Sequence, residues 1–309
     1  MNPIAIVIPT LNRASVLGGA IASALRCEPA PDEIVVVDCG SADETRTVVR
    51  SFGDEVQLIQ RKLPNAASAR NVGLAETRSP YVGFLDSDDE ALPGKTGGLS
   101  TRLDASHAVA LVHGTTEVVE ADGAPSQRRT TQADEERARA REVGTNYQAL
   151  ASFCSMYTSA TLMRREALEQ ISGFDESLDV YEDWDLYLRL SLTWRLEYTE
   201  VPAARYRAWP GNVAWDQTAA GVCRVAEKHL GMLPSVPEAM RGEAEWGFLR
   251  RLATSRYTLV KLAEARRAAW TAFRSEPART LADRDLRRVL ARSWLPVRVL
   301  ERRRSGRST

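Results

Sequence analysis

The chain has 309 residues, of which 44% are hydrophobic and 27% are charged, and its formal net charge is zero. This length accommodates one large domain or two smaller ones, and the apolar content is ample for a hydrophobic core. A neutral chain of this kind argues against a protein whose whole surface binds nucleic acid.

The four cysteines lie far apart in the sequence and form no Cys-x-x-Cys pair. This spacing predicts reduced thiols, with neither a zinc site nor a disulfide framework. The apolar segment 4–8 is too short for a signal peptide, and no run approaches ~18 apolar residues. We therefore expect a cytoplasmic protein that is at most peripheral to the inner face of a membrane.

Four apolar segments predict buried strands at residues 4–8, 33–38, 56–60 and 81–85. Helical patterns separate them. Apolar residues recur at helical spacing from position 16 to 25, Ser41 and Glu44 form a capping-box pattern, and Asn65 opens a further helix. This alternation predicts a parallel α/β sheet built by right-handed crossovers.

Carboxylates follow two of these strands directly. Asp38 ends the second strand, and Asp86, Asp88 and Asp89 follow the fourth. In such sheets, ligands bind beyond the carboxyl ends of the strands. If the backbone stays extended past Leu85, Asp86 and Asp88 point to the same side and suit a divalent cation that carries phosphate. The alternative is an Asp-rich turn that caps the next helix, and the motif alone does not decide.

The chain has no Gly-x-Gly-x-x-Gly motif after the first strand and no Walker loop. This weighs against a dinucleotide-dependent oxidoreductase and against a P-loop NTPase. A nucleotide site here would use carboxylates and a cation in place of a glycine-rich loop.

Four segments resemble, in order and spacing, the motifs of family 2 of the inverting glycosyltransferases: residues 7–13, 37–43, 69–73 and 84–89. The resemblance extends over residues 3–215 and implies the GT-A fold, a Rossmann-like, mostly parallel sheet flanked by helices. It also implies a nucleotide-activated sugar as donor. By it, Pro9, Thr10 and Arg13 line the nucleotide, and Asp38 bonds the base, typically uracil.

The same resemblance places Arg70 near the diphosphate. It makes Asp86 and Asp88 the Asp-x-Asp pair, with Asp88 as a ligand of a manganese or magnesium ion. A fixed cation stabilises the negative charge that develops on the leaving phosphate oxygen. Taken without the resemblance, Asp38 could cap a turn and Arg70 could be a surface residue of a helix.

The second half of the chain has a mixed pattern. Residues 108–112 and 115–119 predict two strands, and residues 132–142 form a charged run typical of a solvated loop or surface helix.

Glu182 and Asp183 fall in the first turn of a predicted helix, where acids usually serve the helix dipole. This segment also resembles the family's Glu-Asp motif, which implies that Asp183 is the general base and that Glu182 lies near the acceptor.

One position departs from the family pattern. Residues 205–212 resemble a segment in which a histidine commonly follows a Tyr-Arg pair, and this chain has Trp209 in that place. The histidine often completes the metal shell, so either water replaces it here or the metal is held more weakly. Trp209 either stacks on a sugar of the acceptor or belongs to the core, and the sequence leaves both open.

Beyond residue 215 the pattern becomes helical and the resemblance fades. Residues 286–300 combine apolar positions with arginines. A basic amphipathic tail can bind an anionic membrane surface, but a helical bundle with a solvated end is the interpretation that we favour. We expect a nucleotide-sugar-binding part at 1–105, an acceptor-binding part at 106–215 and a helical region at 216–309.

These observations predict an inverting glycosyltransferase of the hexosyltransferase type, with a UDP-sugar favoured over a dTDP- or GDP-sugar as donor. The acceptor would be a glycan, a lipid-linked glycan or a small molecule. A sugar-phosphate nucleotidyltransferase would need a glycine- and arginine-rich loop after the first strand, where this chain has none. The other alternative is a catalytically silent GT-A-like protein that binds a nucleotide or a carbohydrate. Asp86, Asp88 and Asp183 argue against it, whereas Trp209 keeps it open.

Overall fold

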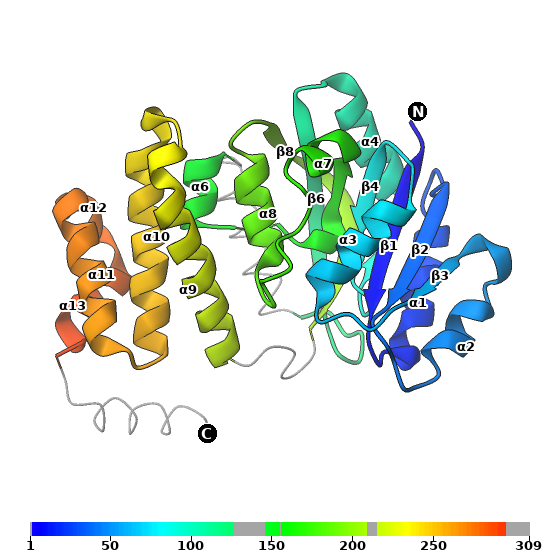
Figure 1. Cartoon of the computed structure of the whole chain (residues 1–309), viewed down its shortest axis with the longest axis horizontal. Coiled ribbons are helices and arrows are strands. Elements are labelled where there is room, and N and C mark those ends of the chain that lie inside the picture. Colours follow the sequence, from blue (N-terminus) through cyan, green and yellow to red (C-terminus); the bar gives the residue numbers. More distant parts are fainter. Residues whose placement is uncertain (1, 127–145, 155, 209–214, 295–309) are drawn as a thin grey trace. The chain divides into compact units, whose positions relative to one another are not determined.

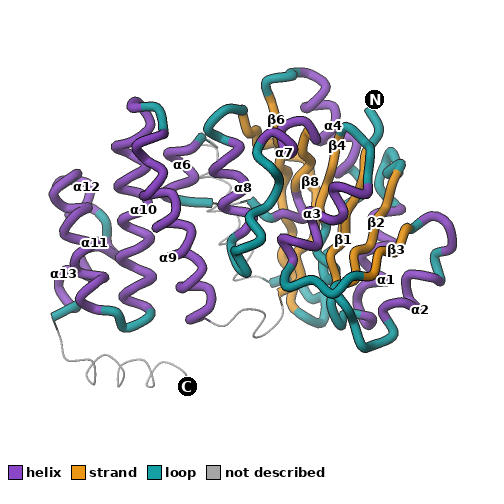
Figure 2. Tube along the Cα trace, in the orientation of Figure 1, coloured by secondary structure: helices purple, strands orange, loops and turns teal. Residues whose placement is uncertain are grey.

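The computed structural model describes residues 2–126, 146–154, 156–208 and 215–294. The chain divides into two compact units. The first comprises Met1–Asn146 and Ser155–Asn212, and the second comprises Tyr147–Cys154 and Val213–Thr309. Figure 1 shows the sheet within the first unit, and Figure 2 shows the described part of the second unit as helices joined by loops.

The described residues of the first unit form an eight-stranded sheet with the order β3-β2-β1-β4-β7-β6-β8-β5. Strands β5 and β7 run opposite to the other six. The strands are β1 (Ile4–Thr10), β2 (Glu33–Asp38), β3 (Gln57–Gln60), β4 (Tyr81–Phe84), β5 (Glu90–Ala91), β6 (Val109–Glu120), β7 (Thr161–Arg164) and β8 (Arg195–Ala208). The helices of this unit are α1 (Ala14–Leu25), α2 (Thr45–Arg50), α3 (Ala66–Glu76), α4 (Lys95–Ala105), α7 (Arg165–Gln170) and α8 (Glu182–Leu190).

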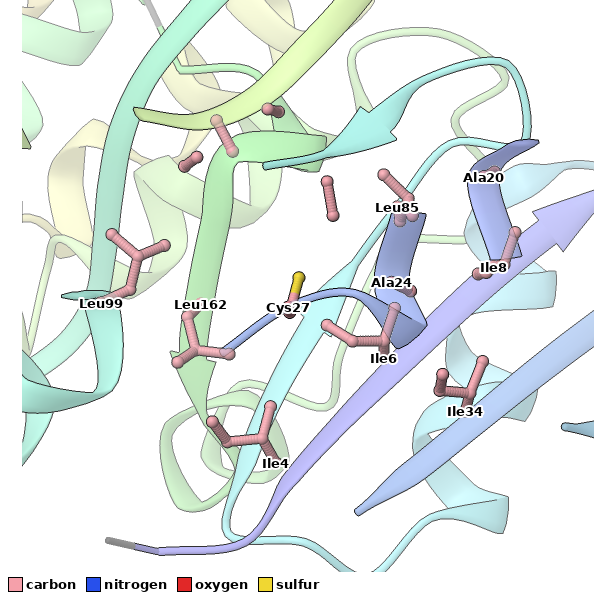
Figure 3. Packing of buried hydrophobic residues seen from close by; sticks show 14 of the residues in the cluster. Ile4, Ile6, Ile8, Ala20, Ala24, Cys27, Ile34, Leu85, Leu99 and Leu162 are labelled. Atoms are coloured by element: carbon pink, nitrogen blue, oxygen red, sulfur yellow. The ribbon is translucent and has the colours of Figure 1, made fainter. Parts of the chain in front are cut away.

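The side chains of β1 alternate between the two faces of the sheet. On one face, Ile4, Ile6 and Ile8 join a buried core with residues of α1 and α4 (Figure 3). On the other face, Val7 meets Gly73 of α3, where an added Cβ would lie 2.2 Å from a Val7 methyl carbon. Because both faces are covered, β1 is buried along its whole length, as is usual at the centre of a parallel sheet. Gly73 therefore allows α3, which carries Arg70, to pack closely on β1.

The prediction of a mostly parallel α/β sheet flanked by helices, with a helical C-terminal region, is confirmed. One local prediction, the capping box of Ser41 and Glu44, is wrong. Helix α2 begins only at Thr45, its N-cap residue Glu44 makes no side-chain cap, and Asp43 Oδ1 accepts from Thr45 N–H at 3.1 Å. The Ser41 hydroxyl instead accepts a hydrogen bond from Asn12 N–H, so a long-range contact takes the place of the local cap.

The prediction of separate strands at 108–112 and 115–119 is also wrong, because both segments belong to β6. The register between β6 and β8 shifts around Gly114. An added Cβ at Gly114 would lie 2.3 Å from Val201 O, so this glycine permits a close approach of the two strands. The break in the apolar pattern therefore marks an irregularity within one strand and not a gap between two.

The second unit contains α6 (Tyr147–Ser152), α9 (Trp215–Met232), α10 (Glu238–Thr258), α11 (Leu262–Ser275), α12 (Pro277–Ala282) and α13 (Arg284–Arg292). The rings of His229 and Phe248 stack with centroids 5.5 Å apart, and the Tyr147 hydroxyl lies 3.2 Å from His229 Nδ1. Gly247 of α10 brings α6 close, since an added Cβ would lie 2.5 Å from Ser152 Oγ. These contacts hold the internal segment 147–152 within the C-terminal unit.

Three predictions fall outside the described residues: the charged run 132–142, Trp209 and the basic tail beyond residue 294. Within the described ranges, every helix is too short or too polar to be a candidate membrane span.

Candidate functional site

Of the predicted site residues that the structure describes, Pro9, Thr10, Asp38 and Asp86 lie at or just beyond the carboxyl ends of β1, β2 and β4. β1 lies between β2 and β4, and Thr10 is opposite Asp38 in the β1–β2 register. The chain leaves β4 into residues 85–89, which we call the acidic loop. The order of the strands reverses direction between β1 and β4, and such a reversal leaves a crevice where ligands bind in open α/β sheets.

Hydrogen bonds tie together the loops that follow β1 and β2. Asn12 N–H donates to Ser41 Oγ at 2.8 Å, and Asn12 Oδ1 accepts from Ala42 N–H at 2.9 Å. Asp43 Oδ2 accepts from Ala14 N–H at 2.9 Å, at the start of α1. Asn12 has a φ of 53°, a conformation that asparagine adopts more readily than most residues. Most of these residues lie within the sequence motifs, but neither the motifs nor the hydrophobic periodicity could predict which hydrogen bonds they form.

Asp38 is buried at the end of β2 and organises the turn that follows. Its Oδ1 accepts from Gly40 and Ser41 N–H at 3.2 and 2.8 Å, and its Oδ2 accepts from Gln60 Nε2 at 3.0 Å. Burial opposes ionisation, but these hydrogen bonds outweigh it and lower the pKa of Asp38. The contact with a nucleotide base that the resemblance implies stays a prediction.

The end of β1 presents a hydroxyl and a guanidinium next to the acidic loop. Pro9 and Thr10 are both buried, and the Thr10 hydroxyl has no hydrogen-bond partner among the described residues. A buried polar group without a partner is costly, so a ligand atom would be a favourable partner here. Arg13 is partly exposed, and its Nη1 lies 3.6 Å from Asp88 Oδ2.

The three carboxylates of the acidic loop have different surroundings. The backbone turns here, because Asp89 N–H donates to Asp86 O at 3.0 Å, so the extended geometry does not persist past Leu85. Burial, followed by the charge of Asp86, raises the pKa of Asp88. Asp89 is buried, and it accepts hydrogen bonds from Ser159 Oγ at 2.6 Å and from Arg207 N–H at 3.0 Å. The Asp89 side chain therefore serves to hold the loop in place through these hydrogen bonds.

Arg70 connects the acidic loop to the start of α8. Its Nη2 pairs with Asp86 Oδ1 at 2.7 Å, and its Nη1 pairs with Glu182 Oε1. The Arg70 side chain is only 4% exposed, and its guanidinium lies 5.4 Å from the centre of the Phe174 ring. Each terminal nitrogen is thus bound to a carboxylate, and the buried Nε–H has no hydrogen-bond partner among the described residues, so the guanidinium keeps donors that these two pairs do not use.

Asp183 lies in the first turn of α8, as the sequence predicted. Its Oδ2 accepts from Thr158 Oγ1 at 3.1 Å, and its Oδ1 accepts from Trp184 N–H at 2.7 Å. Burial and then the charge of Glu182 raise its pKa to about 7, although Arg70, Trp184 and Thr158 oppose the shift. Tyr181, just before this turn, has a left-handed φ of 65°, a strained conformation of the kind found at functional sites.

A buried lysine behind the acidic loop was missed by sequence reasoning. Lys95 is fully buried, and its Nζ donates to Ser159 O at 2.8 Å and lies 3.5 Å from Phe84 O. Burial lowers the pKa of Lys95 to about 8. Lysine is usually exposed, and no local pattern marked this one as buried.

The donor set fits a divalent cation. Within the described residues, no group of three or more His, Cys, Asp or Glu side chains could hold a metal ion by itself. Manganese and magnesium, however, are often bound by one or two carboxylates together with phosphate oxygens of the substrate. Burial and then the charge of Asp86 raise the pKa of Asp88, so a nearby cation would lower the cost of ionising this carboxyl group. Asp86 and Asp88 therefore suit a cation that arrives with a diphosphate.

Known proteins resemble this chain in sequence. A 205-residue alignment with the succinoglycan biosynthesis protein ExoU of Rhizobium meliloti (strain 1021) shows 31% identity and covers 60% of this chain and 56% of ExoU. An uncharacterized glycosyltransferase of Bacillus subtilis (strain 168), YwdF, is 27% identical over 262 residues, which cover 78% of this chain and 93% of YwdF. The chain thus spans little more than half the length of ExoU.

The fold resembles a solved structure. The crystal structure of S. aureus TarS 1-349 in complex with UDP-GlcNAc superposes with a TM-score of 0.62 at 15% identity, covering 91% of this chain and 83% of that one. The GT-A fold that the sequence predicted is therefore confirmed.

The model of glycosyl transferase family 2 matches residues 5–172. The chain belongs to glycosyl transferase family 2, and the prediction of a glycosyltransferase is confirmed at the level of the family.

Proposed function

We propose that this protein transfers a sugar from a UDP-sugar to an acceptor hydroxyl group, with inversion at the anomeric carbon and with a divalent cation bound. The observation that carries the proposal is the Arg70 bridge. It joins Asp86 of the acidic loop to Glu182, the neighbour of Asp183. The bridge thereby holds Asp86, which is suited to the donor, in one cluster with the Glu182–Asp183 pair, which is suited to the acceptor.

Asp183 is the general base in this proposal. A sugar hydroxyl is a poor nucleophile at neutral pH, and a base with a pKa of about 7 is well matched to that pH. Asp183 takes the hydroxyl proton, and the acceptor oxygen forms a bond to the anomeric carbon. The bond from that carbon to the diphosphate oxygen breaks, and its electron pair leaves with the nucleoside diphosphate. One displacement needs only one base, so a second catalytic carboxylate is not required.

Asp86 and Asp88 would hold the manganese or magnesium ion, which supplies positive charge for the leaving diphosphate. Arg13, 3.6 Å from Asp88, adds a second positive group at this place. The Thr10 hydroxyl, which lacks a partner among the described residues, and the turn organised by Asp38 would contact the nucleotide.

The choice of UDP is supported by the family resemblance and by the UDP-GlcNAc that the structural neighbour TarS binds. ExoU is named for succinoglycan biosynthesis, which favours a glycan or lipid-linked glycan over a small molecule as acceptor. A cytoplasmic location belongs to the same proposal, and peripheral membrane contact through the C-terminal tail stays the alternative to the favoured solvated end.

Replacement of Asp88 tests the donor side. Asp88→Ala should abolish the manganese-dependent rise in melting temperature that UDP causes, because a ligand stabilises a protein only as far as it binds the native state. The measurement is thermal unfolding with UDP, with and without manganese. The control is Asp54→Ala, which removes an exposed acid near β3 and should leave the rise unchanged.

A full manganese-dependent rise in the Asp88→Ala protein would contradict the proposed cation site. If the wild-type protein binds UDP with manganese but transfers no sugar to any acceptor class, the silent binding protein becomes the better account.

A further inference from the structure

We propose that the short turn Thr158–Ala160 is a positioning element for both halves of the site. Through Ser159 it fixes the acidic loop, and through Thr158 it fixes Asp183. This inference rests on the proposed function, and it assigns roles to two residues to which no sequence motif pointed.

Two hydrogen bonds of the Ser159 hydroxyl hold the acidic loop. Its hydroxyl donates to Asp89 Oδ2 at 2.6 Å and accepts from Asp86 N–H at 3.1 Å. Its carbonyl oxygen accepts from Lys95 Nζ at 2.8 Å, and the same ammonium lies 3.5 Å from Phe84 O at the end of β4. Ser159 and Lys95 are 1% and 0% exposed, so little water competes for these bonds. The start and the end of the loop are thus anchored to one buried serine.

Thr158 holds the proposed base from the neighbouring position. Its hydroxyl lies 3.1 Å from Asp183 Oδ2 and 3.2 Å from the Tyr187 hydroxyl. A threonine hydroxyl has one hydrogen, and an ionised carboxylate can only accept, so Thr158 donates to ionised Asp183 and accepts from Tyr187. With Trp184 N–H on the other oxygen, both carboxylate oxygens have a fixed donor.

The turn itself is well fixed. Ala160 N–H donates to Tyr157 O at 2.9 Å, and Thr161 Oγ1 donates to Thr158 O at 2.8 Å. Because Thr158 and Ser159 are adjacent and the turn cannot shift at one end alone, the spacing between the acidic loop and Asp183 depends on it. The Arg70 bridge spans the same two elements by an independent route.

Substitutions at Thr158 and at Ser159 should change different measured quantities, namely the pKa of Asp183 and the affinity for UDP. The groups that set the charge of Asp183 are Glu182, which raises its pKa, and Arg70, Trp184 N–H and Thr158, which lower it. Thr158→Val keeps the shape but removes the donor, so the pKa of Asp183 should rise by about one unit. The affinity for UDP with manganese should stay within about twofold of the wild type.

Ser159→Ala should have the opposite signature. It removes the anchor of the acidic loop, so the dissociation constant for UDP with manganese should rise about tenfold. The pKa of Asp183 should not move. Lys95→Met, which removes the ammonium and keeps most of the buried chain, should show the same weakened binding. It replaces Ser159→Ala in the test if circular dichroism shows that Ser159→Ala does not fold.

The pKa of Asp183 is measured by NMR on protein with carbon-13-labelled aspartate carboxyls, with Asp183→Asn for assignment, and UDP affinity is measured by calorimetry. Thr280→Val and Ser100→Ala are matched controls, because each removes a buried hydroxyl outside this network. Neither should change either quantity.

The proposal is overturned if Thr158→Val leaves the pKa of Asp183 unchanged, if Ser159→Ala and Lys95→Met leave UDP binding unchanged, or if every variant changes both equally. Neither readout requires turnover. A wild-type protein that binds UDP and transfers no sugar would therefore contradict the proposed function and leave this test intact.

Discussion

At the scale of single residues, the raised pKa of Asp183, which suits its proposed role as a base, has a cost in stability. Its folded pKa of about 7 lies above the ordinary value of 3.8 that applies in the unfolded chain. Between these values the folded state binds a proton that the unfolded state has released. The stability connected with this proton is fully present below the unfolded pKa, and it is lost as the pH rises through the folded pKa. Ionised Asp183 therefore destabilises the fold at alkaline pH.

Asp183→Asn should consequently stabilise the protein at pH 8, by on the order of 1–3 kcal/mol, and should have little effect near pH 4. The amide keeps the acceptor for Trp184 N–H but carries no charge to bury. The measurement is the free energy of unfolding from urea titrations at both pH values. An equal change at both would show that the substitution acts through packing and not through ionisation.

Motifs in the sequence were sufficient to select Arg70, Asp86 and Asp183 as candidates. They could not show what connects them, since Arg70 and Glu182 are 112 positions apart. Lys95 and Ser159 were missed for a related reason. A buried role for a lysine or a serine depends on the surrounding fold and not on any local spacing.

At the scale of elements, α3 shows which local features a sequence can reveal. Asn65 caps the helix through Ser68, as its position predicted, because a cap depends on residues three positions apart. The close packing of Gly73 on Val7 depends on the pairing of elements, which the local pattern does not contain. The single strand β6 is a similar case, since its irregularity at Gly114 is fixed by the partner strand β8.

Glycine substitutions test this packing. Gly73→Ala should reduce the free energy of unfolding by about 1–3 kcal/mol, because the new methyl group would overlap Val7. Gly19→Ala in α1 is the matched control. A Cβ there meets nothing within 4 Å, so alanine should stabilise the helix by about 0.5–1 kcal/mol.

Chemical denaturation measures both variants. Equal stabilisation by both substitutions would mean that intrinsic helix propensity and not contact with β1 governs both positions.

At the scale of the whole molecule, the alternation of strands and helices predicted the class of fold but not the order of the strands. The reversal between β1 and β4, which creates the site, depends on β4 pairing with β1 on one side and with β7 on the other. Likewise, the segment Tyr147–Cys154 belongs to the C-terminal unit, although the sequence around it belongs to the first. Such arrangements are set by long-range packing, which a single sequence does not display.

The central claim is that Asp183 is the general base of a sugar transfer. It is tested most directly by kcat for transfer at pH 7.5 in the Asp183→Asn variant of the 309-residue chain, measured together with the dissociation constant for UDP in the presence of manganese. The proposed mechanism predicts that kcat falls ~10²–10⁴-fold, because the proton acceptor is lost. The dissociation constant should change by no more than about twofold, because in the proposed mechanism Asp183 contacts the acceptor and not the donor. Near-wild-type turnover would contradict the mechanism, and the base would then have to be sought elsewhere, beginning with Glu182.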